Sequence, residues 1–308
     1  MYRYVARRLL LIIPILLTVI FIVFVILNIT PGDPATIILG RDATLEAKAQ
    51  LTKELGLDKP VLVRYVLYIK DALRLDFGRS YRSGQPVFQE ILIKFPTTLW
   101  LAILSVIVSS IIGIPLGIVS AVKQYSFLDI SLTVSALFLA SIPSFWLGIM
   151  LILVFSLGLG LLPSSGIGSL KHFIMPVMTL ALPSAAYLSR MTRATMLETM
   201  RMDYIRTAKA KGAGPQRIIW RHALQNALLP VITVIGMTFA GLLGGAMITE
   251  IVFGLPGIGN TIVMAIKMKD YPIVMASTLF LATLFMLIML AVDLIYAYID
   301  PRLKAQFK

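Results

Sequence analysis

The sequence predicts an all-α integral membrane protein with six transmembrane helices. Of its 308 residues, 58% are hydrophobic and only 14% are charged, whereas an ordinary soluble domain carries about 25% charged residues. A helix needs about 20 apolar residues to cross a hydrocarbon core about 30 Å thick. Segments of this kind lie at about 9–29, 99–122, 130–157, 173–189, 228–252 and 273–299.

The first segment is predicted to be a retained helix rather than a cleaved signal peptide. Arg3, Arg7 and Arg8 precede it, but its apolar run is longer than that of a signal peptide, and no small-residue cleavage site follows. The fourth segment is short, and Pro176 and Pro183 interrupt it. Prolines are tolerated in membrane helices because neighbouring helices satisfy the freed carbonyl groups.

The net charge of +13 has two interpretations, nucleic-acid binding or the positive-inside rule. The short loops predicted to be external hold only Lys171, Lys267 and Lys269 as basic residues. The loop between spans four and five instead contains Arg190, Arg193, Arg201, Arg206, Lys209, Lys211, Arg217 and Arg221. This asymmetry favours a multi-pass membrane protein with both termini in the cytoplasm and no nucleic-acid partner.

The long segment between spans one and two is predicted to form a small helical domain outside the membrane. Prolines end the first span, and residues 45–55 and 62–75 show helical apolar spacing. A disordered loop is the alternative, against which the apolar stripes argue. The domain organisation predicted is a transmembrane helix (1–30), an extracytoplasmic helical domain (31–95), a transmembrane core (96–299) with a cytoplasmic loop (190–226), and a cytoplasmic tail (300–308).

The spans carry few groups that could drive transport or catalysis. His172 and His222 lie outside them, and Asp293 lies about 10 Å inside the inner end of the last span, where packing or anchoring is its expected role. An ion-coupled carrier usually needs intramembrane ionisable groups or broken helices. No phosphate-binding loop of an ATPase occurs either, and the chain has no cysteine. An ion-coupled carrier, a membrane enzyme and an assembly subunit are therefore kept only as alternatives to a transport subunit powered by a partner.

The cytoplasmic loop at 203–226 is predicted to form a helix, a sharp turn and a second helix. Gly212 suits a left-handed helix end, and Pro215 suits the first position of the following helix. Ala208 and Ala210 leave a thin helix that another protein could approach closely. From the pattern alone, a docking element and a basic loop that only sets topology remain equally open.

At these residues the sequence resembles the membrane permease subunits of bacterial ABC importers for dipeptides, oligopeptides, glutathione and nickel. The resemblance covers essentially the whole chain. Its main carrier is 203–212 with 221–230, which is similar to the family's ATPase-docking loop. Further matches are Pro31-Gly32-Asp33-Pro34, Asp76-Phe77-Gly78 with Ser80, Pro96-Thr97-Thr98-Leu99, the run Glu250 to Gly259, Asp270-Tyr271-Pro272, Asp293-Leu294-Ile295-Tyr296 and Asp300-Pro301-Arg302.

The resemblance implies a type I ABC importer permease fold in the bacterial inner membrane and a set of partners. These are a homologous second permease subunit, two cytoplasmic ATPase subunits that hold ATP and Mg, and an extracytoplasmic substrate-binding protein. The chain itself would bind no cofactor or metal and catalyse no reaction. The implied substrate is a di- or oligopeptide or glutathione, with a nickel or metal-chelate importer as the alternative.

The resemblance also implies two groups of site residues. The ATPase-coupling loop would comprise Asp203, Tyr204, Arg206, Thr207, Ala208, Ala210, Lys211, Gly212, Arg217, Arg221, His222 and Asn226. The outer gate and binding-protein face would comprise Glu250, Phe253, Gly254, Pro256, Gly257, Asp270 and Tyr271.

Two of these assignments carry qualifications. The general importer loop has Glu-Ala-Ala where this chain has Arg206-Thr207-Ala208, so Asp203 is the nearest acidic candidate for the docking contact. Headgroup anchoring is the alternative to a gating role for Glu250.

Overall fold

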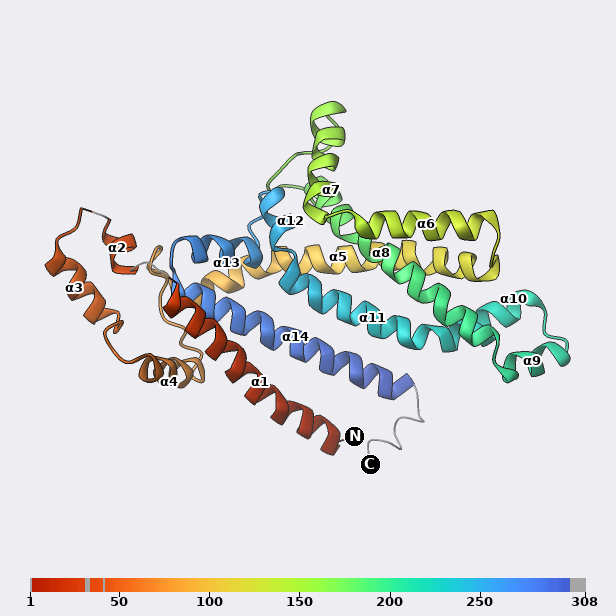
Figure 1. Cartoon of the computed structure of the whole chain (residues 1–308), viewed down its shortest axis with the longest axis horizontal. Coiled ribbons are helices and arrows are strands. Elements are labelled where there is room, and N and C mark those ends of the chain that lie inside the picture. The colour runs from red at the N-terminus through yellow and green to blue at the C-terminus, as the bar shows by residue number, and fades with distance from the viewer. Residues whose placement is uncertain (1, 31–33, 41, 300–308) are drawn as a thin grey trace.

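The computed structural model describes residues 2–30, 34–40 and 42–299, and this part of the chain is almost entirely helical (Figure 1). Residues 31–33 of the proline motif after span one and the tail at 300–308 lie outside the described residues. The helices are α1 (Tyr2–Ile29), α2 (Pro34–Leu39), α3 (Leu45–Glu54), α4 (Val61–Ala72), α5 (Val87–Val122), α6 (Phe127–Ser141), α7 (Ser144–Leu151), the π-helical η1 (Ile152–Gly158), α8 (Lys171–Met200), α9 (Asp203–Ala210), α10 (Pro215–Arg217), the π-helical η2 (Ile218–Ala223), α11 (Leu224–Gly245), α12 (Met247–Val252), α13 (Ile258–Lys267) and α14 (Tyr271–Ile299).

Five helical stretches among the described residues are long and apolar enough to cross a membrane. They are Val5–Ile29 of α1, α5, α8, Pro215–Gly244 through α10, η2 and α11, and Tyr271–Ile295 of α14. The total becomes six if α6 and the α7–η1 segment count as one broken span. The all-α membrane fold is confirmed, and the number six remains a prediction.

The prediction of one continuous helix at 130–157 is wrong. Phe127–Ser141 and Ser144–Gly158 are bent by 98° relative to each other. Ile142 between them is extended (φ −78°, ψ 126°) and precedes Pro143. Proline disfavours helical backbone in the residue before it, so an apolar run long enough for one span becomes two helices.

Two other membrane helices are longer than expected, because residues outside their apolar segments are helical as well. α5 begins at Val87 rather than at 99, and α8 continues to Met200 rather than ending at 189. Pro176 and Pro183 lie inside α8 without ending it. Most of α8 is shielded by other helices, which is the setting in which prolines are tolerated.

The centre of the bundle is the contact between α5 and α8, which run side by side in Figure 1. Gly113 and Gly117 of α5 make this contact possible. A Cβ atom on Gly113 would lie 2.6 Å from the Ala185 carbonyl oxygen, and one on Gly117 would lie 2.6 Å from the Thr192 Cβ. Gly113 and Gly117 form a G-x-x-x-G motif, and this motif therefore acts in close packing within the chain. Gly241 and Gly245 of α11 have the same spacing, but the space around the Cβ position of Gly241 is open.

The two ends of the bundle differ in what they carry (Figure 1). One end, here called the α13 end, carries α2, α3, α4, α12 and α13. The opposite end, here called the α9 end, carries α9 and α10. The helices expected near 45–55 and 62–75 are present as α3 and α4.

The carboxylate of Asp293 in the last span forms an ion pair. Its Oδ2 lies 3.1 Å from Nη2 of Arg8 in α1. The pair joins the first and last spans, which also pack together along their length. A charge within a membrane helix is costly unless it is paired, so this contact supports the packing role expected for Asp293.

Candidate functional site

The α9 end consists of a short helical hairpin whose helix α9 buries one apolar side chain against the bundle. Ile205 of α9 is fully buried and packs in a cluster with Ile118, Met196, Ile218 and Ala223. These neighbours come from α5, α8 and η2. α9 therefore sits against three elements of the bundle through a single anchor.

The turn of the hairpin has the backbone that the sequence predicts. Gly212 has φ +81°, a left-handed conformation that glycine adopts without steric cost. Gly214 is extended at the N-cap, and Pro215 begins α10. α10 then continues without interruption through η2 into α11, so the hairpin is joined directly to a membrane helix.

Most predicted coupling residues lie on the exposed surface of this hairpin. Ala208 and His222 are half-buried, and the others are exposed. The Asp203 carboxylate lies 3.7 Å from the Arg206 guanidinium, and both groups face water, so their attraction is weak. Within the base of the hairpin, Asn226 Nδ2 donates a hydrogen bond to the His222 carbonyl at 3.0 Å.

At the α13 end, a buried carboxylate joins two of the sequence motifs. Glu250 has 0% of its surface exposed. Its Oε1 accepts a hydrogen bond of 2.6 Å from the Thr98 hydroxyl, and its Oε2 accepts one of 2.8 Å from the backbone nitrogen of Asn260. The Thr98 hydroxyl oxygen in turn accepts from the backbone nitrogen of Ile258 at 2.9 Å. Glu250 thus fixes the start of α13 against α5.

Glycines beside Glu250 leave the room that its carboxylate occupies. A Cβ atom on Gly257 would collide with the carboxyl group, and one on Gly259 would lie 2.7 Å from the Met247 Cα. The motif from Glu250 to Gly259 is therefore one folded unit, in which the carboxylate occupies space that a side chain at position 257 would need. Headgroup anchoring, the alternative role for Glu250, does not fit a fully buried side chain.

A second buried carboxylate joins the segment after α4 to the start of α14. Asp270 Oδ2 accepts a hydrogen bond of 2.5 Å from the Ser80 hydroxyl, and Oδ1 accepts one of 3.1 Å from the backbone nitrogen of Tyr81. The backbone nitrogen of Arg82 also approaches Oδ2, at 3.4 Å. The motifs at 76–80 and 270–272 are thus one contact in space.

The predicted outer-gate residues are mostly buried in this conformation. Phe253, Gly257, Asp270 and Tyr271 are buried together with Glu250. Pro256 is half-buried, and Gly254 is exposed. The exposed residues of this end include Gly254 and its neighbours Ile248, Ile251, Met264 and Ile266.

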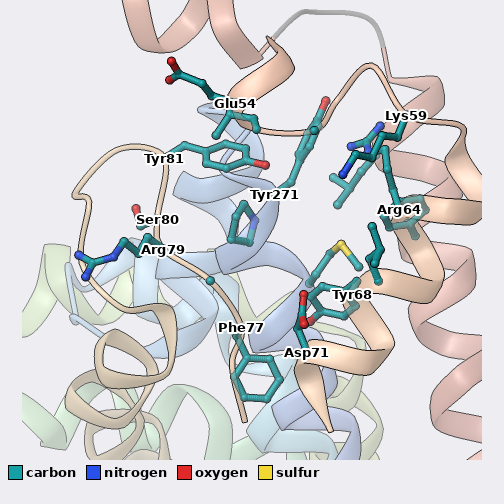
Figure 2. A pocket seen from close by; sticks show the side chains of 18 of the residues that line it. Glu54, Lys59, Arg64, Tyr68, Asp71, Phe77, Arg79, Ser80, Tyr81 and Tyr271 are labelled. Atoms are coloured by element: carbon teal, nitrogen blue, oxygen red, sulfur yellow. The ribbon is translucent and has the colours of Figure 1, made fainter. Parts of the chain in front are cut away.

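A cavity of about 640 Å³ lies at the α13 end, between α3, α4, the segment 76–81 and the start of α14 (Figure 2). Cations and anions are balanced in its wall, and tyrosines supply further polar groups. Burial raises the pKa of Tyr81 to about 12 and also raises the pKa of Tyr68, so both phenols keep their protons at neutral pH. The charged residues are Glu54, Lys59, Arg64, Asp71, Asp76 and Arg79.

Comparisons with known proteins agree on one family. Residues 113–305 match the model of the binding-protein-dependent transport system inner membrane component, and residues 1–102 match the model of its N-terminal part. The chain belongs to this family of ABC importer permeases. The resemblance carried by the sequence motifs is therefore confirmed.

Relatives of this permease match over their full length. It is 42% identical to the dipeptide transport system permease protein DppB of Alkalihalophilus pseudofirmus, covering 99% of this chain and 100% of the relative. It is 41% identical to the glutathione transport system permease protein GsiC of Escherichia coli K12, covering 99% of each. Both relatives are named as transport components.

Solved structures support the same fold. The inward-facing MetNI methionine ABC transporter matches with a TM-score of 0.58 and 20% identity, covering 69% of this chain and 97% of the matched chain. At that identity the likeness concerns the fold only. The apolar helices and the family together make the permease a multi-pass inner-membrane protein.

The permease also contains a partly buried ion pair that sequence reasoning missed. Asp129 at the start of α6 is 2% exposed, and its two carboxylate oxygens lie 2.7 and 2.8 Å from Nε and Nη2 of Arg193 in α8. Ser120 and the Tyr125 backbone nitrogen also donate to it. Arg193 lies in the loop interpreted above as setting the topology, and its partner is 64 residues away in the chain, so no local pattern indicates the pair.

Proposed function

We propose that the chain is the pore-forming permease subunit of an ABC importer that carries di- or oligopeptides, or glutathione, into the cytoplasm. The full-length identity of 40–42% to dipeptide and glutathione permeases carries this proposal. The mixed charge of the cavity wall suits a substrate that bears both an amino and a carboxylate group.

The proposed complex contains a homologous second permease, two ATPases and an external substrate-binding protein. The α9 end faces the cytoplasm in this arrangement, as the basic loop residues predict. ATP and Mg would be bound by the ATPases, and this chain would bind no cofactor and catalyse no reaction. The exposed surface of α9 and α10 would dock on the ATPases.

Coupling would follow from the way in which the hairpin is attached. Ile205 holds α9 against α5, α8 and η2, while α10 continues into α11. A displacement of α9 by closing ATPases would therefore move several helices together. A bundle with two packed states can be biased in this way by a partner's ligand.

The test is transport by a reconstituted complex. The tagged permease is purified gently with its companions, which are identified by mass spectrometry, and the complex is placed in liposomes with its binding protein. Uptake of labelled dialanine or glutathione is measured with ATP, with ADP, and with an ionophore added. The proposal predicts uptake that needs ATP and survives the ionophore. Uptake by the chain alone that follows an ion gradient would instead establish a secondary carrier.

A further inference from the structure

Helix α4 carries an apolar stripe that no other part of the described chain covers. Leu62, Val66 and Leu73 are 66%, 63% and 81% exposed. Their spacing of four and seven residues places them on one side of the helix. Lys70, four residues after Val66, lies at the edge of this stripe, and Arg74 lies just past Leu73, which caps the C-terminal end of α4. In water, this stripe would be an unfavourable surface for a small helical segment.

The neighbouring side of α4 packs on the half of α1 that leads to the α13 end. The Tyr65 hydroxyl donates to the Leu17 carbonyl at 2.8 Å, and the Tyr65 ring lies 5.3 Å from the ring of Phe21 and 5.9 Å from that of Phe24. Leu17 lies about 18 Å before Ile29 along the helix axis. Contacts with α4 thus extend well inside the candidate span Val5–Ile29.

Only a small share of the α1 span is buried by other described helices, and an apolar span of this length is surrounded by lipid wherever no protein covers it. Its exposed side chains include Ile13, Ile22 and Ile26. Because α4 contacts α1 through residues 17–28, its uncovered stripe lies within reach of the same lipid. A water-soluble protein could reach the stripe only by displacing that lipid.

The other side of α4 is polar and looks away from the lipid. Arg64 donates to the Asn28 side chain at 2.8 Å and lies over the Phe24 ring at 5.5 Å. Arg64 and Asp71 line the cavity shown in Figure 2. α4 therefore separates a polar cavity from an apolar surface, as an interfacial helix does.

We propose that α4 is an interfacial helix bound to the bilayer leaflet at the α13 end. Leu62, Val66 and Leu73 enter the acyl-chain region, and Lys70 and Arg74 extend to lipid phosphates, as long basic side chains do at membrane surfaces. The segment between α1 and α5 is then held by lipid as well as by protein. This inference depends on α1 spanning the membrane and is independent of the substrate.

The natural absence of cysteine allows a direct test with single labels. The full chain is made as Val66→Cys or Leu73→Cys, spin-labelled, and reconstituted in nanodiscs of phosphatidylethanolamine and phosphatidylglycerol. Collision with oxygen, which concentrates in lipid, is compared with collision with a water-soluble nickel chelate. Ile13→Cys is the lipid-facing control, and Lys53→Cys on the exposed surface of α3 is the water-facing control.

The proposal predicts that the labels at 66 and 73 give an oxygen-to-nickel collision ratio several-fold above that at 53 and close to that at 13. A ratio at 66 and 73 equal to that at 53 would overturn it. Protection from nickel that appears only after a purified binding protein is added would also overturn it, because the stripe would then be a protein-docking surface. Leu62→Cys replaces either variant that fails to elute like the wild-type protein.

Discussion

The two ends of the permease are built on different physical principles. At the α13 end, buried carboxylates of Glu250 and Asp270 join segments that are distant in sequence through short hydrogen bonds. At the α9 end, the hairpin exposes nearly all its polar groups, and its helix α9 buries the apolar side chain of Ile205 against the bundle. The α13 end is therefore stabilised by polar contacts within the chain, whereas the α9 end leaves its polar groups available to a partner.

One polar contact near the α9 end is buried within the chain, and breaking it should have the largest effect on stability. The buried Asp129 carboxylate forms an ion pair near the α9 end with Arg193, whose side chain is 27% exposed. We expect Asp129→Ala to lower stability by about 3–5 kcal/mol, because the carboxylate accepts hydrogen bonds from Arg193, Ser120 and the Tyr125 backbone nitrogen, and bonds to charged groups contribute about 1.5–3 kcal/mol each. Thermal unfolding in detergent, compared with Glu198→Ala at an exposed position of α8, measures the effect. Equal melting temperatures for the two variants would show that the pair contributes little.

Glu250→Ala tests the internal network at the α13 end. The change leaves the Thr98 hydroxyl and the Asn260 backbone nitrogen without their acceptor, and each such buried group costs about 1–3 kcal/mol. We expect a lower melting temperature and, in reconstituted complexes, altered uptake kinetics. Glu46→Ala on the exposed surface of α3 is the matched control. A Glu250→Ala protein with wild-type stability and unchanged uptake would contradict both the network and the predicted gating role.

Gly212→Val tests the hairpin turn at the α9 end. A non-glycine residue at φ +81° is strained by about 1–2 kcal/mol, although the Cβ position itself is open. We expect the variant to reach the membrane and its complex to hydrolyse ATP without matching uptake. Gly214→Val is the control, because Gly214 is extended and its Cβ position is also open. Normal uptake by Gly212→Val would argue against a docking role for the turn.

Asp203→Ala should have the smallest effect on stability, because the polar groups of the α9 end face outward rather than into the protein. Its ion pair with Arg206 is exposed, and such pairs contribute about 0–1 kcal/mol. If Asp203 supplies the acidic docking contact, co-purification of the ATPases should fall while the melting temperature of the permease stays the same. Unchanged recovery of ATPases would remove Asp203 as that contact, and Asn substitution at the same position separates charge from side-chain length.

Residue patterns alone predicted much of the α9 end because its features are local. The left-handed Gly212, the helix start at Pro215 and the continuation into α11 all depend on neighbours in the chain. The motifs at the α13 end were equally visible, but their pairing was not. Thr98 and Glu250 are distant in sequence, and no local rule brings them within 2.6 Å.

The sequence by itself determined the membrane class, the helical content and the family, because apolar length and turn residues act locally. Pro143 explains locally why the 130–157 run breaks, but only the tertiary structure gives the 98° angle between its two helices. The tertiary structure also decided that Asp129 pairs with Arg193, that Glu250 is buried, and that α4 lies beside α1. Each of these depends on which surfaces meet after the helices pack, since burial and pairing are set by neighbours in space.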